Sequence, residues 1–253
     1  MRRLNGRAAL VTGGGSGIGR ATALRLAAEG ASVAVSGRRA ELLEETVAAV
    51  EREGGTAVAL PGDVTIEEEA RRMVEQTRAR FGKLDVLVNN AGAIRRGLRL
   101  HEVPTERWDE QIAVNLRGVF LVTRAALAVM LEGRGDRSLI NIASTFAHTN
   151  AVGVGPYAAA KGGVVALTRS LAVEYAEQGI RANCVCPAIV DTPLARVDRS
   201  DFDERRETYA GMFPLGRVGE PEDVAAAVAY LASGEAGWVT GVVVDIDGGF
   251  TAR

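Results

Sequence analysis

The chain has 253 residues, 47% of them hydrophobic and 25% charged, which is an ordinary composition for a soluble globular protein. Its net charge of −2 gives no long-range field that would attract nucleic acid or an anionic membrane, so we expect small-molecule partners. The basic N-terminus leads into an apolar stretch that stops at Thr12, too short for a signal peptide or a membrane span, which favours a cytoplasmic protein. Because no linker or low-complexity run divides the chain, residues 1–253 are expected to form a single domain.

Short apolar, β-branched runs alternate along the chain with longer segments of helical period. The expected strands are 8–11, 33–35, 57–60, 86–88, 139–142, 182–185 and 242–246. The expected helices are 18–29, 40–53, 66–81, 105–132, 157–178 and 221–232. Strands joined by helices run parallel, so this order predicts an α/β fold: a Rossmann-type doubly wound parallel sheet of about seven strands, with helices on both faces. Ligands then belong at the carboxyl ends of the strands.

Local signals mark several of the helix ends. Thr65 and Glu68, three residues apart, form a predicted capping box, and Pro221 suits a first helical position. Gly82 and Gly179 can close the helices that precede them. These signals support the helix boundaries given by the apolar period.

The two cysteines, Cys184 and Cys186, lie two residues apart in an expected strand, so both side chains point to one face. A zinc site uses about four ligands, and the chain has only two histidines. We therefore expect two buried thiols and no metal site.

A glycine-rich loop follows the first expected strand and leads into the first helix. Glycines allow a sharp turn and a close backbone approach to a pyrophosphate, while the N–H groups and the dipole of a helix start favour negative charge. The spacing G-x-x-x-G-x-G differs from the standard dinucleotide fingerprint, so the strand–loop–helix setting carries the argument. The expected phosphate-binding residues are Gly13, Gly15, Ser16, Gly17, Ile18 and Gly19.

Two further motifs make the chain resemble the classical short-chain dehydrogenase/reductase family across nearly its whole length. The loop matches the family's T-G-x-x-x-G-x-G, residues 89–92 match its N-N-A-G, and residues 63–64 match the position that holds the adenine. The resemblance implies hydride transfer between a nicotinamide dinucleotide and a carbon bearing a hydroxyl or carbonyl group. It adds these expected cofactor contacts: Asp63, Val64, Asn90, Ala91 and Gly92.

The end of the second strand bears on the choice between NADP and NAD. The general dinucleotide pattern places an acidic residue about 20 positions after the glycines, where it binds the ribose 2′-hydroxyl and selects NAD. In family terms Gly37 occupies that position here, followed by Arg38 and Arg39, and an arginine can grip a phosphate bidentately. NADP(H) is therefore favoured. NAD(H) is the alternative if both arginines are solvated surface charges.

Four residues match the family's catalytic set. Tyr157 and Lys161 lie four apart on one face of an expected helix, thirteen residues after Ser144. A tyrosine can deliver or accept a proton as hydride moves if its pKa, about 10 when free, is lowered, and an adjacent ammonium favours the phenolate. By resemblance, Tyr157 is the general acid/base and Lys161 lowers its pKa and binds the nicotinamide ribose. Ser144 orients the substrate oxygen, and Asn115 holds a proton-relay water.

After the sixth strand the family has a Pro-Gly segment that touches the nicotinamide amide. Here residues 187–192 read P-A-I-V-D-T, so Ala188 departs from the pattern and could restrict the backbone, whereas Thr192 matches the hydroxyl offered to the carboxamide. The expected contacts are Pro187, Ile189, Val190 and Thr192. The D-G-G at 247–249 resembles the family's closing motif and implies a turn that supports the fold and subunit contacts.

Substrate contacts are expected in three segments: the one after N-N-A-G, the one after the catalytic serine, and a lid at about 188–216. The candidates are Arg95, Phe146, His148 and Val152. If Arg95 or His148 faces the pocket, an anionic or polyhydroxylated substrate such as a sugar acid is indicated. A 3-oxoacyl compound or another apolar ketone is the alternative.

Two other functions could use the same fold. A non-catalytic regulatory protein that binds the cofactor would be expected to lose members of the catalytic set, and all four are present. An epimerase or dehydratase with a transient hydride usually has a longer chain. The long helices 105–132 and 157–178 carry apolar positions that pair across subunits in the family, so a homotetramer, or a dimer, is expected.

Overall fold

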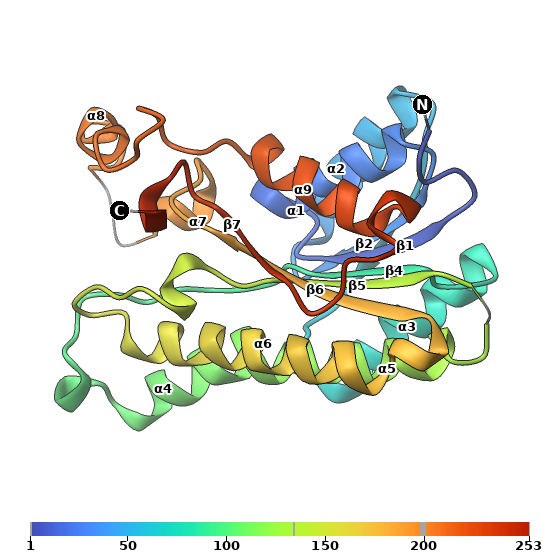
Figure 1. Ribbon diagram of the computed structural model, residues 1–253, viewed down its shortest axis with the longest axis horizontal. Helices are drawn as coiled ribbons and strands as arrows, with labels where there is room; N and C mark the ends of the chain where they lie inside the picture. Colours follow the sequence, from blue (N-terminus) through green and yellow to red (C-terminus); the bar gives the residue numbers. More distant parts are fainter. Residues whose placement is uncertain (1, 134, 198–200, 253) are drawn as a thin grey trace.

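The computed structural model describes residues 2–133, 135–197 and 201–252. Within these residues, seven parallel strands form one sheet in the order β3-β2-β1-β4-β5-β6-β7 (Figure 1). The strands are β1 Ala8–Thr12, β2 Ser32–Gly37, β3 Thr56–Pro61, β4 Val86–Asn89, β5 Arg137–Ile142, β6 Ile180–Pro187 and β7 Val243–Ile246. The strand order reverses between β1 and β4, and this reversal is where open α/β sheets bind ligands. The predicted doubly wound fold is confirmed.

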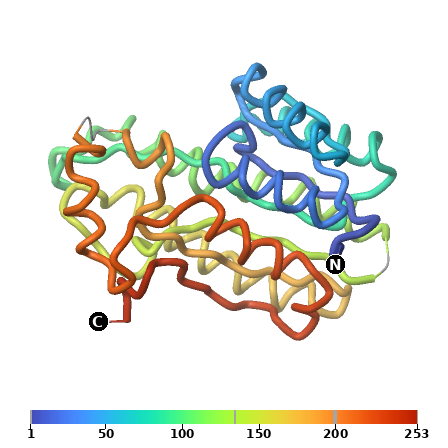
Figure 2. Tube along the Cα trace, turned by 90° about the horizontal axis from the view of Figure 1, so that it is seen from above, coloured from blue at the N-terminus to red at the C-terminus, as the bar shows by residue number. Residues whose placement is uncertain are grey.

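Helices cover both faces of the sheet. In Figure 1, α1, α2 and α9 lie on one face and α3, α4, α5 and α6 on the other. The main helices are α1 Gly17–Ala28, α2 Ala40–Arg52, α3 Glu67–Phe81, α4 Thr105–Ile112, α5 Gly118–Met130, α6 Gly155–Glu174 and α9 Pro221–Ala232. Two short helices, α7 Pro193–Arg196 and α8 Arg206–Ala210, lie at the same end of the molecule as the C-terminal residues (Figures 1 and 2). This end holds the carboxyl ends of the strands.

The central strands are buried on both faces because both are covered by helices. Along β1, Ala9 and Val11 belong to the cluster that contains Leu26 of α1, whereas Leu10 belongs to the cluster that contains Leu121 of α5. Double-sided burial explains why these strands read as continuous apolar runs rather than as alternating ones.

Helix ends follow most of the local signals. Helix α9 begins at Pro221, as predicted, and Gly82 closes α3 with a φ of +79°, in the left-handed region that favours glycine. The helix predicted at 157–178 starts earlier, at Gly155, and its last residues form a separate single turn, Ala176–Gln178. Gly179 ends that turn with a φ of +72°.

The start of α3 differs from the prediction. The capping box of Thr65 and Glu68 is wrong, because the helix begins at Glu67 without a side-chain cap. The Thr65 hydroxyl instead donates to Oδ1 of Asp63 at 2.8 Å, so it closes the turn that follows β3.

The helix predicted at 105–132 contains an unexpected π-helical turn. This turn, Ala113–Arg117, joins α4 to α5 and contains the fully buried Asn115. π-helical turns are rare in proteins as a whole, and those that occur are often found at functional sites. Length and composition alone would let Thr105–Met130 span a membrane, but α5 packs against the sheet through Leu121 and Val122.

Cys184 and Cys186 are buried free thiols, as predicted. Their sulfur atoms lie 4.0 Å apart on the face of β6 that is covered by α6, where they pack with Val164. The two side chains share one face because their separation matches the two-residue repeat of a strand.

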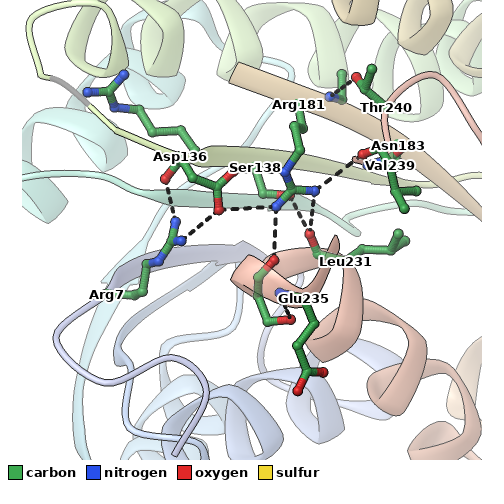
Figure 3. Close-up of polar contacts among 12 residues, drawn as sticks. Arg7, Asp136, Ser138, Arg181, Asn183, Leu231, Glu235, Val239 and Thr240 are labelled. Atoms are coloured by element: carbon green, nitrogen blue, oxygen red, sulfur yellow. Dashed lines mark hydrogen bonds and ion pairs between the residues drawn. The ribbon is translucent and has the colours of Figure 1, made fainter. Parts of the chain in front are cut away.

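At the amino ends of the strands, Arg181 of β6 is buried in a polar network (Figure 3). Its guanidinium donates to Asp136 at 2.8 Å and to the carbonyl oxygens of Leu231 at 2.9 Å and Ser233 at 3.2 Å. Arg7 donates to Asp136 at 2.7 Å. Burial would raise the pKa of the Asp136 carboxyl, but the hydrogen bonds from Arg181 and Arg7 outweigh it and hold that pKa below its usual value. The network therefore keeps the Asp136 carboxylate ionised.

Candidate active site

The glycine loop after β1 leaves no room for side chains. Gly13 and Gly17 have φ values of +66° and +51°, which favour glycine. A Cβ at Gly19 would overlap the carbonyl oxygen of Gly13, and one at Gly14 would lie 2.7 Å from Cβ of Val35. The loop is therefore a tight turn whose exposed backbone faces the start of α1.

Asn90, after β4, fixes this loop. Its amide Nδ2 donates to the carbonyl oxygens of Thr12 at 2.9 Å and Gly13 at 3.2 Å. The backbone N–H groups of Asn90 and Ala91 both donate to the Thr12 hydroxyl at 3.0 Å. The N-N-A-G segment thus holds the glycine turn against the central strands.

The residues at this turn fit a dinucleotide. The first turn of α1 presents backbone N–H groups without intrahelical acceptors, and its N-cap residue Ser16 makes no side-chain cap, so an anion can bind there. Arg39 donates to the Ser16 hydroxyl at 3.4 Å. Arg38, whose side chain is 77% exposed, lies 4.0 Å from the Asp63 carboxylate, which accepts hydrogen bonds from Thr65. Two cations therefore flank the mouth of the glycine turn.

A cavity of about 290 Å³ opens at the carboxyl ends of β4, β5 and β6. It joins the glycine turn to the predicted catalytic residues. Of the residues predicted from the sequence, those that line it are Ile18, Asn90, Gly92, Ser144, Phe146, Tyr157, Lys161, Pro187, Ile189, Val190 and Thr192. These residues come from five separate segments of the sequence and meet around one space.

Tyr157 lies in the first turn of α6 and is only 6% exposed. Its ring packs edge-on against Phe146, with ring centroids 6.4 Å apart. Burial raises the pKa of the Tyr157 phenol to about 12, although the hydrogen bond with Ser144 and the charge of Arg96 act to lower it. The phenol is therefore held in its protonated form.

Lys161 lies one helical turn after Tyr157 and is buried. Its ammonium donates to the carbonyl oxygen of Ile142 at 2.8 Å and lies 5.6 Å from the centroid of the Tyr157 ring. Burial lowers the pKa of Lys161 to about 8. The expected lowering of the Tyr157 pKa by Lys161 is not observed, because burial dominates and the lowering contributions come from Ser144 and Arg96.

Ser144 follows β5 and caps the single 3-10 turn Thr145–Ala147 by accepting from the Phe146 N–H at 3.2 Å. Asn115, in the π turn, uses both amide donors, to the carbonyl oxygens of Ala93 at 2.8 Å and Gln111 at 3.0 Å. It also accepts from the Ala93 N–H at 3.2 Å. Asn115 therefore anchors the segment that follows N-N-A-G.

The segment after β6 forms the wall opposite α6. The Thr192 hydroxyl donates to the carbonyl oxygen of Val190 at 3.2 Å and accepts from the Ala195 N–H at 3.3 Å, which starts helix α7. Ala188, in place of the expected glycine, lines the cavity, and its N–H donates to the carbonyl oxygen of Ile246 at 3.2 Å.

The substrate candidates separate into two groups. Phe146 lines the cavity, but Arg95 is exposed outside its lining and Val152 is 81% exposed. His148 also lies outside the lining and faces Asp245, with 3.2 Å between Nε2 and Oδ1. The residue that enters the lining is the next arginine, Arg96, whose Nη1 donates to the carbonyl oxygen of Val197 at 3.2 Å.

Sequence reasoning missed several further wall residues. Phe250 comes from the closing turn, for which the resemblance implies only support of the fold and subunit contacts, and its ring centroid lies 5.9 Å from that of Phe213. The predicted lid at 188–216 contributes Leu194, Ala195, Met212 and Phe213, while its residues 198–200 lie outside the described residues. An apolar residue after D-G-G, close to the last strand, was the only available signal for Phe250.

Comparison with known proteins places this geometry in a family. The family model described as Enoyl-(Acyl carrier protein) reductase matches residues 13–251. The (3R)-3-hydroxyacyl-CoA dehydrogenase of Mus musculus is 40% identical and covers 98% of this chain and 97% of its own. The cis-4-hydroxycyclohexanecarboxylate dehydrogenase of Sinomonas cyclohexanicum is 41% identical and covers 97% of each chain.

Solved structures agree. One from Beutenbergia cavernae, proposed to be an NAD(P)-dependent gluconate 5-dehydrogenase and containing NADP at low occupancy, is 38% identical. It matches with a TM-score of 0.92 over 100% of this chain and 99% of that one. By fold, motifs and similarity, the chain belongs to the classical short-chain dehydrogenase/reductase family of NAD(P)-dependent oxidoreductases.

Proposed function

We propose that this protein is an NADP(H)-dependent oxidoreductase that interconverts a secondary alcohol and a ketone, with Tyr157 as the general acid/base. The observation that carries the proposal is that Ser144, Tyr157 and Lys161 meet in one cavity beside a glycine turn shaped for a pyrophosphate. The nicotinamide, when bound, supplies or accepts the hydride. The chain's own part is to move one proton at the substrate oxygen and to hold both reactants.

Tyr157 is the group that moves the proton. Because burial raises its pKa to about 12, the phenol carries a proton at neutral pH and can donate it to a carbonyl oxygen. In the oxidative direction Tyr157 must accept a proton, and the nearby charge of Arg96 and the hydrogen bond with Ser144 both stabilise the phenolate. Ser144, which lines the same cavity, is placed to orient the substrate oxygen.

Lys161 and Asn115 support this proton transfer by holding the cofactor and by positioning the neighbouring main chain. The buried ammonium of Lys161 is placed to bind the cofactor's ribose, and its hydrogen bond to Ile142 fixes its direction. Asn115 is a positioning residue in this account. Since both of its amide donors are used inside the protein, a relay water would be held by main-chain groups near the π turn.

The preference for NADP(H) rests on the end of β2. Gly37 offers no carboxylate to a ribose hydroxyl, and Arg38 and Arg39 follow it at the mouth of the glycine turn. A charge-assisted hydrogen bond to a 2′-phosphate contributes about 1.5–3 kcal/mol, which corresponds to roughly tenfold to hundredfold in affinity.

The substrate we propose is a hydroxy or keto acid with a compact body. Among the described residues, the lining of the cavity is largely apolar and includes one guanidinium, that of Arg96, whose charge acts on Tyr157. An arginine in such a setting can bind a carboxylate through two parallel hydrogen bonds. The names of two relatives, a hydroxycyclohexanecarboxylate dehydrogenase and a proposed gluconate dehydrogenase, describe carboxylate substrates. A 3-oxoacyl thioester, suggested by the mouse relative, is the second candidate.

The test compares Arg96→Gln with the matched control Arg95→Gln, because Arg95 lies outside the cavity lining. Each variant is assayed with keto acids, their methyl esters and 3-oxoacyl thioesters. For Arg96→Gln we expect KM for the acids to rise about tenfold to hundredfold, with little change for the esters, and Arg95→Gln to match the wild type. Equal KM values for acid and ester in the wild type, or preference for the thioester, would contradict the proposed substrate class.

We also propose that the chain forms a homotetramer, with a dimer as the alternative. Large apolar side chains stand exposed on its surface, among them Phe120 of α5 at 44%, Val173 of α6 at 82% and Trp238 before β7 at 100%. Such side chains are typical of subunit contacts when they form contiguous patches. Elution at the monomer mass in size-exclusion chromatography with light scattering would rule this out.

A further inference from the structure

Three side chains that can bind metals meet beside the cavity, although they lie far apart in the sequence. They are His148, after the turn that follows Ser144, Cys186 at the end of β6, and Asp245 in β7. Their candidate ligand atoms all lie within 4.8 Å of one another. The sequence analysis expected no metal site because a zinc site uses about four ligands and the chain has only two histidines, and it did not include an aspartate from a distant strand.

The sheet itself fixes two of these ligands. Cys186 and Asp245 are direct partners in the parallel pairing of β6 with β7, so their side chains leave the same face of the sheet. Val243, two residues before Asp245, packs with Cys186 in the cluster under α6, which identifies that face. His148 reaches the same face from the loop after β5, and its Nε2 lies 3.2 Å from Oδ1 of Asp245.

We propose that His148, Cys186 and Asp245 bind one Zn²⁺ ion, with a water molecule as the fourth ligand. A thiolate, an imidazole and a carboxylate are a typical donor set for zinc and not for magnesium or calcium. Zinc binds its ligands at about 2.0–2.3 Å, so ligand atoms stand roughly 3.5 Å apart in a tetrahedron. The spacing of His148 and Asp245 already suits this geometry, and the thiol must approach by about 1 Å.

Small movements of two side chains can close that gap. The side chains of His148 and Asp245 are 38% and 31% exposed, so they can rotate toward the buried sulfur and leave one position open to water. The Cys186 thiol gives up its proton to solvent when the ion binds.

The bound ion would join the catalytic loop to the last strand. His148 lies four residues after Ser144, and Asp245 accepts from the Thr251 hydroxyl at 3.2 Å, next to the wall residue Phe250. Zinc therefore ties two walls of the cavity together without using a catalytic side chain. We expect it to raise the melting temperature of the full-length protein, since a ligand that binds only the native state stabilises it.

The experiment titrates the metal-free, full-length protein with Zn²⁺ by calorimetry and with Co²⁺ by absorption. We expect one ion per chain, intense visible bands from tetrahedral cobalt, and a thiolate-to-cobalt charge-transfer band. His148→Ala and Asp245→Asn should each weaken binding about tenfold or more. Cys186→Ser should abolish the charge-transfer band. None of these readouts depends on turnover, so failure of the metal site and failure of the proposed function are distinguishable.

Two controls use the chain's other histidine and its other cysteine. His101→Ala and Cys184→Ser should bind Zn²⁺ and Co²⁺ as the wild type does, although the Cys184 sulfur lies only 4.0 Å from that of Cys186. Should Cys186→Ser fail to fold, the two variants at exposed side chains decide the question. The proposal is overturned if binding is not stoichiometric, if it persists unchanged in His148→Ala and Asp245→Asn, or if cobalt gives no charge-transfer band. His148 and Asp245 would then be a surface contact that binds no metal.

Discussion

The two ends of the parallel sheet handle buried polar groups in opposite ways. At the amino ends, Arg181 and Asp136 are paired with each other and hydrogen-bonded further, and the Asp136 pKa is shifted so that the carboxylate stays ionised. At the carboxyl ends, burial shifts the pKa values of Tyr157 and Lys161 toward their neutral forms. Burying a charge costs free energy at both ends. Hydrogen bonds from Arg181 and Arg7 offset this cost for Asp136 at the amino ends, whereas burial dominates for Tyr157 and Lys161 at the carboxyl ends.

The difference indicates a division of labour. A network in which every charge is paired stabilises the fold but has nothing left to offer a ligand. At the carboxyl ends, Tyr157 keeps a proton that it can donate to a substrate oxygen, and the pKa of Lys161 lies closer to neutral pH than its usual value. Variants at the amino end should therefore change stability without changing turnover, and variants at the carboxyl end should do the reverse.

The largest effect is expected for Tyr157→Phe. Loss of the hydroxyl removes the proton donor, so kcat should fall by about 10²–10⁴-fold, while the aromatic ring that packs on Phe146 remains. Steady-state kinetics and a thermal melt on the same sample measure both quantities. Tyr175→Phe, at the far end of α6 and outside the cavity lining, is the matched control. An unchanged kcat in Tyr157→Phe would contradict the role of Tyr157 as proton donor.

Asp136→Asn tests the amino end. The substitution leaves the buried guanidinium of Arg181 without its counter-charge, and because the Asp136 side chain is 30% exposed we expect a loss of about 1–3 kcal/mol of unfolding free energy. Urea denaturation should show this loss, and kcat of the folded enzyme should not change. The exposed ion pair of Glu75 with Arg71 supplies a control, because Glu75→Gln should change stability by no more than about 1 kcal/mol. A large fall in kcat for Asp136→Asn would contradict the proposed division.

Gly37→Asp tests whether the end of β2 selects NADP(H) over NAD(H). A Cβ at Gly37 would make only ordinary contacts, the nearest 3.7 Å from Leu43, so the substitution is sterically tolerated. The added carboxylate would repel a 2′-phosphate and accept a hydrogen bond from a ribose hydroxyl. We expect the ratio of kcat/KM for NADPH over NADH to fall about tenfold to hundredfold. An unchanged ratio in Gly37→Asp and in Arg38→Gln would show that the end of β2 does not select the cofactor.

The smallest expected effect is the loss, at acidic pH, of the stability that the Asp136 network contributes. Because the pKa of Asp136 is lower in the folded state than its unfolded value of about 3.9, the network's stabilisation is present above that value. It is lost as the pH falls through the lower, folded pKa. The stability curves of the wild type and Asp136→Asn should therefore converge below about pH 4. Urea titrations at a series of pH values measure this, and a constant gap down to the most acidic pH would contradict the origin assigned to it.

Much of the fold could be predicted from the sequence because its signals are local. Buried parallel strands read as apolar runs, and Pro221 and Gly82 mark helix ends through their own backbone preferences. The cap at Thr65 failed because Thr65 lies one residue before the N-cap position, Ile66, and its hydroxyl donates to Asp63 within the preceding turn. The π turn that contains Asn115 has no signature in composition.

Some residues of the candidate site could likewise be predicted from local motifs, and others depend on the path of loops and on long-range packing. Motifs with fixed spacing brought Ser144, Tyr157 and Lys161 to one cavity. Which of two adjacent arginines faces that cavity depends on the path of a loop, and the structure places Arg96 rather than Arg95 there. Phe250 depends on contact between the chain's end and the lid, a long-range packing that local patterns do not encode.

The most direct test of the central claim follows NADPH oxidation with a panel of keto acids, comparing the wild type with Tyr157→Phe at equal cofactor occupancy. The account predicts turnover by the wild type, faster with NADPH than with NADH, and a loss of about 10²-fold or more in the variant although it still binds cofactor. Turnover in Tyr157→Phe at the wild-type rate would contradict it. Cofactor binding by the wild type without turnover of any compound would identify a regulatory protein instead.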